Sequence, residues 1–144
     1  MEQNYEKAAE LLLYIGIGYI NKNDLEESYL HICPKLLHSE VDPDYLNATQ
    51  AYYLATMYDF GILNAYNDHN ELINENCAAY LYEIALKDNH PSAAYFLGKL
   101  YAYGNGVETD YQKAYSLYRT AQINGYPYNI DDDIQYVRNH LNQN

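Results

Sequence analysis

The chain has 144 residues, the ordinary length of one domain, and roughly 68–70% of an unfolded chain's surface can be buried at that size. It carries 20 Asp and Glu against 8 Lys and Arg, so its formal net charge is −12. That charge repels nucleic-acid phosphates and anionic lipid surfaces, and we therefore expect neither nucleic-acid nor membrane binding.

Tyrosine dominates the bulky side chains of the sequence. The chain contains 20 Tyr, two Phe and no Trp. A tyrosine ring packs like an apolar group while its hydroxyl needs water or a hydrogen-bond partner. Many of these rings are therefore expected to lie half-buried.

The first twenty residues resemble neither a secretory leader nor a membrane span. Met1–Glu10 contains three Glu and one Lys, which is the wrong charge balance for a signal peptide. The apolar run Leu11–Ile20 is much shorter than the ~20 residues a spanning helix needs, and Gly16 and Gly18 interrupt it. We expect a cytoplasmic protein.

Helix start and stop signals recur along the rest of the chain. The start signals are capping residues at Asp42 before Pro43, at His90 before Pro91, and at Thr109 with Gln112 as a capping box. The stop signals are residues that tolerate a left-handed backbone, at Gly61, Asn89, Gly104 and Gly125. Together with the apolar period they predict seven helices, at about 3–21, 24–38, 43–60, 74–88, 91–103, 110–124 and 131–142.

The helices repeat in pairs. In the first helix of each pair, Leu97-Gly98-x-x-Tyr101-x-x-Gly104 matches Leu54-Ala55-x-x-Tyr58-x-x-Gly61 at a shift of 43 residues. In the second helix of each pair, Ala114-x-x-Leu117-Tyr118-x-x-Ala121 matches Ala78-x-x-Leu81-Tyr82-x-x-Ala85 at a shift of 36 residues. A weaker first copy contains Ile15-Gly16-x-x-Tyr19, then Ser28 and Ile32. A period of this length indicates a repeat architecture.

The two shifts differ by seven residues, which places an insertion between Gly61 and Ala78. Loops absorb insertions and helices do not, so we expect Leu63–Ile73 to be an exposed loop. The small residues of the repeat, Gly98 and Ala55, are expected where the two helices of a pair cross closely.

The third unit resembles a known repeat. Its signature is Ala93-x-x-x-Leu97-Gly98-x-x-Tyr101-x-x-Gly104-x-Gly106-Val107-x-x-Asp110-x-x-Lys113-Ala114-x-x-Leu117-Tyr118-x-x-Ala121-x-x-x-Gly125. This resembles the Sel-one-like repeat, a relative of the tetratricopeptide repeat, with departures at Leu117 and Gln122. The second unit departs further, with Ala55 for Gly, Asn74 for Asp and Cys77 for Lys.

The resemblance implies an all-α fold: a short right-handed α/α superhelix of about three helix-turn-helix repeats and a C-terminal capping helix. The whole chain 1–144 would be one domain, with repeats at about 3–40, 43–89 and 91–126 and a cap at 130–142; the three repeats are called units 1, 2 and 3 below. Proteins similar to this family are mostly scaffolds, adaptors and regulatory binders.

No motif in the sequence indicates catalysis, a cofactor or a metal. The five His are at 31, 38, 69, 90 and 140, and they form no H-E-x-x-H motif and no pair four residues apart. Cys33 and Cys77 are 44 positions apart and form no C-x-x-C, so we interpret both as small buried apolar residues. Asp131–Asp133 is typical of a helix start, where acids cap the backbone and oppose the helix dipole.

The expected binding surface is the concave side of the superhelix, formed by the first helix of each pair. Counting in steps of three or four from the small residue selects the partner-binding residues Leu13, Ile17, Tyr52, Thr56, Asp59, Tyr95 and Lys99. The same count includes Glu10, Ile20, Thr49, Ser92 and Ala102 as groove positions. Burial of Leu13, Ile17 and Ile20 inside the chain or in a homodimer is the alternative that the sequence leaves open.

Two functions fit these features. The first is a non-catalytic adaptor or regulator that binds a peptide or protein segment in the groove. The second is an immunity or antitoxin-like protein that covers the basic surface of a cognate toxin, which the charge of −12 favours. The protein partner itself is not named by the residues.

Overall fold

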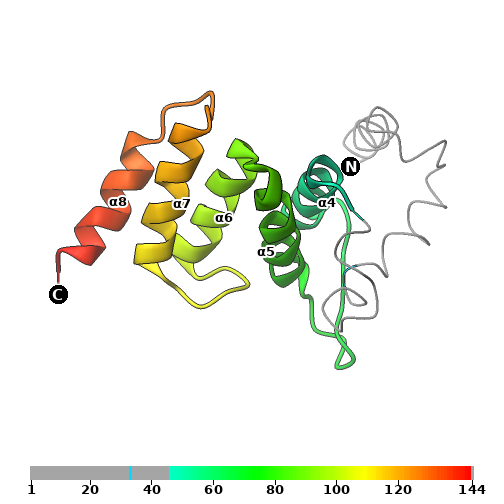
Figure 1. Cartoon of the computed structure of the whole chain (residues 1–144). Helices are drawn as coiled ribbons and strands as arrows, with labels where there is room; N and C mark the ends of the chain where they lie inside the picture. Colours follow the sequence, from blue (N-terminus) through cyan, green and yellow to red (C-terminus); the bar gives the residue numbers. More distant parts are fainter. Residues whose placement is uncertain (1–32, 34–45, 144) are drawn as a thin grey trace.

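The computed structural model describes Cys33 and residues 46–143 (Figure 1). These residues form the α-helices α4 (Ala48–Asp59), α5 (Asn74–Ala85), α6 (Pro91–Tyr103), α7 (Tyr111–Ile123) and α8 (Asp131–Leu141), with a 3-10 turn at Leu86–Asp88. The described part of the chain is thus helical, apart from an isolated β-bridge between Tyr66 and Leu72. The expected helices 3–21 and 24–38 lie outside the described residues, except Cys33, which is helical.

Each helix packs against the next one in the chain, in the order α4, α5, α6, α7 and α8 (Figure 1). Two clusters of buried side chains fill the spaces between them. One cluster is centred on α4, α5 and the start of α6, and the other lies between α6, α7 and α8. No helix among the described residues has both the length and the apolar character that crossing a bilayer requires.

The helix ends follow local signals, with two corrections. His90 caps α6 as expected, its Nδ1 accepting the Ala93 N–H at 3.3 Å. The cap of α7 is Asp110 and not Thr109, because the Asp110 carboxylate accepts the Lys113 N–H at 2.9 Å. The helix expected from residue 43 has its start at Ala48 instead.

A capping box that the sequence reading missed explains the start of α4. Asn47 Oδ1 accepts the Gln50 N–H at 2.9 Å, and Gln50 Oε1 accepts the Asn47 N–H at 3.1 Å. Two of the backbone donors at a helix start that lack helical partners are thereby satisfied. The earlier candidates Asp42 and Pro43 lie outside the described residues.

All four expected stop residues adopt the left-handed backbone, with φ of +71° at Gly61, +55° at Asn89, +68° at Gly104 and +89° at Gly125.

The expected close helix crossing is also confirmed. A Cβ added to Gly98 would lie 2.8 Å from the Tyr118 ring of α7, which leaves no room for a side chain. The repeat alanines of the second helices, Ala78, Ala85, Ala114 and Ala121, are all 0% exposed.

Candidate functional site

The structure describes five of the seven expected binding residues. Tyr52, Thr56 and Asp59 lie on α4, Tyr95 and Lys99 lie on α6, and all five are partly exposed. Leu13 and Ile17 lie outside the described residues, and so does the homodimer contact considered for them. Of the further groove positions, Ala102 is 1% exposed and is therefore a core residue, which corrects that part of the expectation.

Tyr52 is held in a stack of rings between α4 and the start of α6. Its ring stacks on His90 at a centroid distance of 4.2 Å and lies 6.2 Å from the ring of Tyr82 on α5. Burial raises the pKa of the Tyr52 hydroxyl, and a hydrogen bond with Ser92 opposes that rise. Burial also lowers the pKa of His90, so the stack favours a neutral imidazole.

Tyr95 occupies the same kind of stack one unit later. Its ring stacks on Tyr126 at 4.5 Å and lies 5.8 Å from Tyr118 on α7. Its hydroxyl donates a hydrogen bond to Asp133 Oδ2 on α8 at 3.3 Å. Burial, followed by the negative charge of Asp133, raises the pKa of Tyr95 to about 12.

The two stacks are built from residues at matching repeat positions. Tyr52 and Tyr95 are related by the 43-residue shift, and the partners Tyr82 and Tyr118, like His90 and Tyr126, are related by the 36-residue shift. Pro91 follows His90 just as Pro127 follows Tyr126. The same packing is therefore reproduced in both units, with a histidine at one position and a tyrosine at the other.

Asp59 and Lys99 form the polar flank of this surface. Asp59 Oδ2 accepts a hydrogen bond from the Tyr82 hydroxyl at 2.9 Å. Burial raises the pKa of Asp59, while that hydrogen bond and the charge of Lys99 lower it. Lys99 Nζ lies 5.9 Å from the centre of the Tyr95 ring.

The Thr56 hydroxyl makes a hydrogen bond within its own helix. Its hydroxyl donates a hydrogen bond to the Tyr53 carbonyl oxygen one turn earlier, at 2.7 Å. A hydroxyl that binds its own helix in this way has its hydrogen already engaged. Only the methyl group and the oxygen lone pairs of Thr56 remain for a partner.

Sequence reasoning missed a continuous row of rings across the same surface. The row runs from the end of α4, over α6, to the connection between α7 and α8, with neighbouring centroids 4.5–5.7 Å apart. We call it the aromatic strip, and it consists of Phe60, Phe96, Tyr95, Tyr126 and Tyr128. Its two end rings are 63% and 72% exposed, whereas most large apolar side chains of the described residues are covered.

The strip could not be found by counting along one helix. Phe96 follows Tyr95 directly and so lies off the counted face, and Phe60 is the C-cap residue of α4. Tyr126 and Tyr128 belong to the α7–α8 connection. The one sequence signal was the match between His90-Pro91 and Tyr126-Pro127, which marks Tyr126 as a repeat position.

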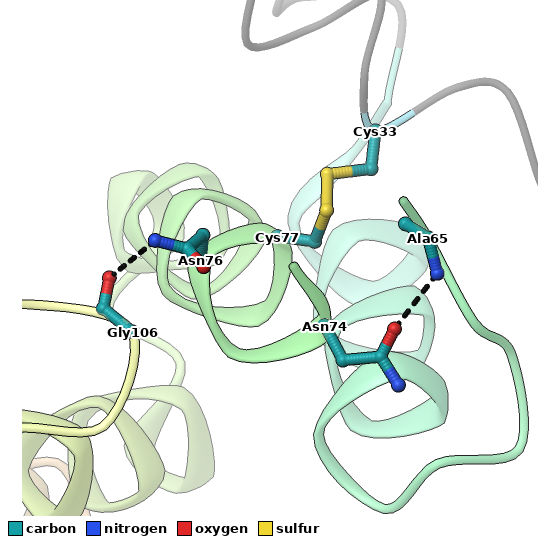
Figure 2. Close-up of a disulfide and its surroundings, with 6 residues drawn as sticks. All are labelled: Cys33, Ala65, Asn74, Asn76, Cys77 and Gly106. Carbon is teal, nitrogen blue, oxygen red and sulfur yellow. Dashed lines mark hydrogen bonds between the residues drawn. A yellow bond between two sulfur atoms is a disulfide. The ribbon is translucent and has the colours of Figure 1, made fainter. Parts of the chain in front are cut away.

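The inserted loop has a buried base. Leu63 and Ala65 are each 2% exposed, so the base of the loop belongs to the core and the expectation that all of Leu63–Ile73 is exposed was wrong. The Asn74 side chain, itself only 7% exposed, accepts the Ala65 N–H at 2.8 Å (Figure 2) and donates to Asn64 Oδ1 at 2.9 Å.

Beyond this base the loop forms a small hairpin at 66–72. Asn67 Oδ1 accepts the N–H groups of His69 and Glu71, at 3.0 and 2.9 Å. Two apolar side chains of the hairpin, Tyr66 and Leu72, are 50% and 57% exposed. The hairpin is thus an exposed structure with its own hydrogen bonds.

The cysteines are buried as expected but are not free. Cys33 and Cys77 are both 0% exposed and form a disulfide, which joins Cys33 to the start of α5 (Figure 2). The interpretation of two unconnected thiols was wrong because residues 44 positions apart in sequence become neighbours only through the fold. Spacing alone carries no information on such a contact.

Asp131, Asp132 and Asp133 lie in the first turn of α8, where negative charge opposes the helix dipole. None of them caps the helix, since the N-cap residue is Ile130 and it makes no side-chain cap. Within the described residues, no group of three His, Cys, Asp or Glu side chains is arranged to hold a metal ion.

Comparison of the chain with protein-family models, with curated proteins and with solved structures finds no significant match.

Proposed function

We propose that this chain is a non-catalytic protein-interaction module, an adaptor or regulatory binder, which holds a segment of its partner on the surface of α4 and α6 that carries the aromatic strip. The observation that carries this proposal is the row of five contacting rings with both end rings exposed. Aromatic side chains are enriched at binding hot spots, since they bury a large area and lose little conformational entropy on binding.

The proposed architecture is a single domain of three Sel-one-like units with a capping helix. The repeated ring stacks of Tyr52 and Tyr95 support it. A second repeated contact supports it as well. Lys113 Nζ on α7 pairs with Glu83 Oε1 on α5 at 3.0 Å, and Cys77 on α5 is bonded to Cys33.

These two contacts occupy matching repeat positions. Lys113 and Cys77 each directly precede the first repeat alanine of the second helix. Glu83 directly follows Tyr82, and Cys33 directly follows Ile32, the residue aligned with Tyr82 in the weaker first copy. Each contact thus links a second helix to the unit before it, as a stack of related repeats requires.

A capture experiment with a matched control tests the proposal. Wild-type chain and the Phe60→Ala/Tyr128→Ala variant would each be used as bait in an extract of the source cells, with mass spectrometry of the bound proteins. A partner retained by the wild type and lost from the variant is expected, while the circular dichroism spectra stay equal. Equal capture by both proteins would exclude the strip as the binding surface.

The second candidate function is an immunity or antitoxin-like protein, and the net charge of −12 is the observation that favours it. Such a protein would bind a basic toxin with an association rate that falls steeply with salt. The acidic and exposed hairpin 66–72 would be its natural contact, with Asp68 and Glu71 facing the toxin's basic residues. Loss of binding in Asp68→Asn/Glu71→Gln, with no effect of Phe60→Ala/Tyr128→Ala, would select this function.

The expected cytoplasmic location needs its own test. Disulfides persist in oxidising compartments and are rare in the cytosol, so the Cys33–Cys77 bond argues for an oxidising location. Trapping thiols with an alkylating reagent in intact source cells, followed by mass spectrometry, measures the state of both cysteines. Alkylated cysteines would support a cytoplasmic location, and a bonded pair would favour an oxidising compartment.

A further inference from the structure

We propose that the strip's occupant is a basic, extended polypeptide segment, with arginines placed over the rings and against the carboxylates beside them. This inference rests on the proposed function, because it names the partner class for the same surface. It comes from the charges that flank the aromatic strip, the exposure of its ends and the length of the row.

The flanking charge is mainly negative. Asp59 precedes Phe60 at one end of the strip, and Asp133 lies against Tyr95 near the other, with the exposed Asp131 and Asp132 beside it. Within the described residues, no Lys or Arg nitrogen lies within 4.0 Å of Asp59 or Asp133. Lys99, over the Tyr95 ring, is the cation that the described residues place in contact with the strip.

A guanidinium group fits this combination better than other side chains do. The face of an aromatic ring attracts cations, and arginine also stacks its planar group on such a face. A carboxylate can accept two parallel hydrogen bonds from the same guanidinium. An acidic segment would instead meet like charges at both ends. A neutral apolar segment would leave Asp59 with only the more distant charge of Lys99, and Asp133 with only its hydrogen bond from Tyr95.

The shape of the strip favours an extended segment. The row leads from α4 to the α7–α8 connection through four steps of 4.5–5.7 Å between neighbouring ring centroids. At most about six or seven extended residues cover the path along these rings, because a strand advances about 3.3 Å per residue. Alternate side chains of such a segment would face the rings.

The direct test is fluorescence anisotropy with three labelled twelve-residue peptides, in which Thr alternates with Arg, Gln or Glu. The Arg peptide is expected to bind the wild-type chain at least tenfold more tightly than the Gln peptide, and the Glu peptide is expected not to bind. Phe60→Ala/Tyr128→Ala should weaken binding of the Arg peptide at least tenfold. Asp59→Asn/Asp133→Asn should weaken it about fivefold and reduce its salt dependence.

Two control variants separate this surface from general acidity. Asp68→Asn/Glu71→Gln removes two charges, and Tyr66→Ala/Leu72→Ala removes two exposed apolar groups, all on the hairpin 66–72. Both controls should change the affinity less than twofold. Equal weakening by the charge control and by Asp59→Asn/Asp133→Asn would overturn the proposal, since only net charge would then matter.

Other outcomes distinguish the partner class from the function itself. Equal binding of the Gln and Arg peptides, lost in Phe60→Ala/Tyr128→Ala, would overturn the basic partner while the binding function stands. Failure of all three peptides, together with equal capture from extracts by wild type and variant, would overturn both. A dimer in light scattering that Phe60→Ala/Tyr128→Ala dissociates would identify a second copy of the chain as the occupant and overturn the basic segment.

Discussion

Units 2 and 3 build the same helix pair with different chemistry at matching positions. In unit 3, Asp110 caps α7, and Lys113 forms a half-exposed ion pair with Glu83 of the unit before. In unit 2, Asn74 instead ties the inserted loop to the start of α5, and Cys77 forms a disulfide. The two units therefore make different kinds of contact at matching sequence positions.

The turns that join the two helices of each unit differ as well. In unit 3, a short turn joins α6 to α7, and its Gly106 lies against the start of α5. Asn76 Nδ2 donates a hydrogen bond to the Gly106 carbonyl oxygen at 3.0 Å (Figure 2). A Cβ at Gly106 would lie 2.3 Å from the Glu75 backbone, so only glycine fits. Unit 2 replaces that turn by a longer loop whose base is buried at Leu63 and Ala65.

The disulfide offers the largest test of this comparison. Replacing both cysteines, as Cys33→Ala/Cys77→Ala, should lower the free energy of unfolding by about 4 kcal/mol, because the unfolded chain loses a cross-link that closes a long loop. Lys113→Ala, at the matching position, should cost less than about 1 kcal/mol because its ion pair is exposed to solvent. Denaturant unfolding with and without reductant measures both, and equal losses would contradict the contrast between the units.

The helix crossing provides the next largest effect. Gly98→Leu should destabilise by about 3 kcal/mol, since overpacking a close contact typically costs 1–3 kcal/mol. Gly98→Ala should cost less, since unit 2 holds a fully buried alanine at the matching position, Ala55. Urea unfolding followed by circular dichroism gives the two midpoints. An unchanged midpoint for Gly98→Leu would show that α6 and α7 do not cross at this residue.

The matching polar residues Asn74 and Asp110 should differ in the same experiment. Asn74→Ala leaves the buried Ala65 N–H without its acceptor, and an unsatisfied buried group costs about 1–3 kcal/mol. Asp110→Ala removes an exposed helix cap, which typically costs about 1 kcal/mol. The helix content of both variants should remain native. A larger loss from Asp110→Ala would mean that the loop is held by contacts other than Asn74.

The ring stacks should give the smallest effect, and of the two stacks only the one that contains His90 should lose stability at acidic pH. Burial lowers the pKa of His90 in the Tyr52 stack, so its contribution is complete above the unfolded pKa of about 6.5 and falls as the pH drops below that value. The pKa of Tyr95 is raised to about 12, so its contribution is complete below pH 10 and is lost as the pH rises toward 12.

His90→Asn keeps a capping oxygen and removes the titration, so it should flatten the decline in stability from pH 7 to pH 5. The expected difference is below about 1 kcal/mol, since His90 is partly solvated. Tyr95→Phe should reduce the loss of stability between pH 10 and 12 in the same way. Unfolding free energies measured across the two pH ranges test both, and a decline that persists in both variants would assign it to other groups.

The candidate site was only partly accessible to sequence reasoning. Tyr52 and Tyr95 were found because both lie three residues before a small repeat residue, and a helix converts that spacing into a common face. Phe60, Tyr126 and Tyr128 were not found, because they lie at a helix end and in a connection where no helical period applies. Their place in one row of rings depends on how neighbouring helices pack.

The sequence by itself determined the helices from residue 74 onward, their left-handed ends and the small residue at the α6–α7 crossing. These features depend on hydrogen bonds, backbone angles and spacings within a few residues, which local sequence specifies. The tertiary structure decided that Cys33 bonds to Cys77, that Asn74 holds Ala65, and that five rings form one strip. Those contacts join residues separated by a turn, a loop or a whole unit, and only packing brings them within reach.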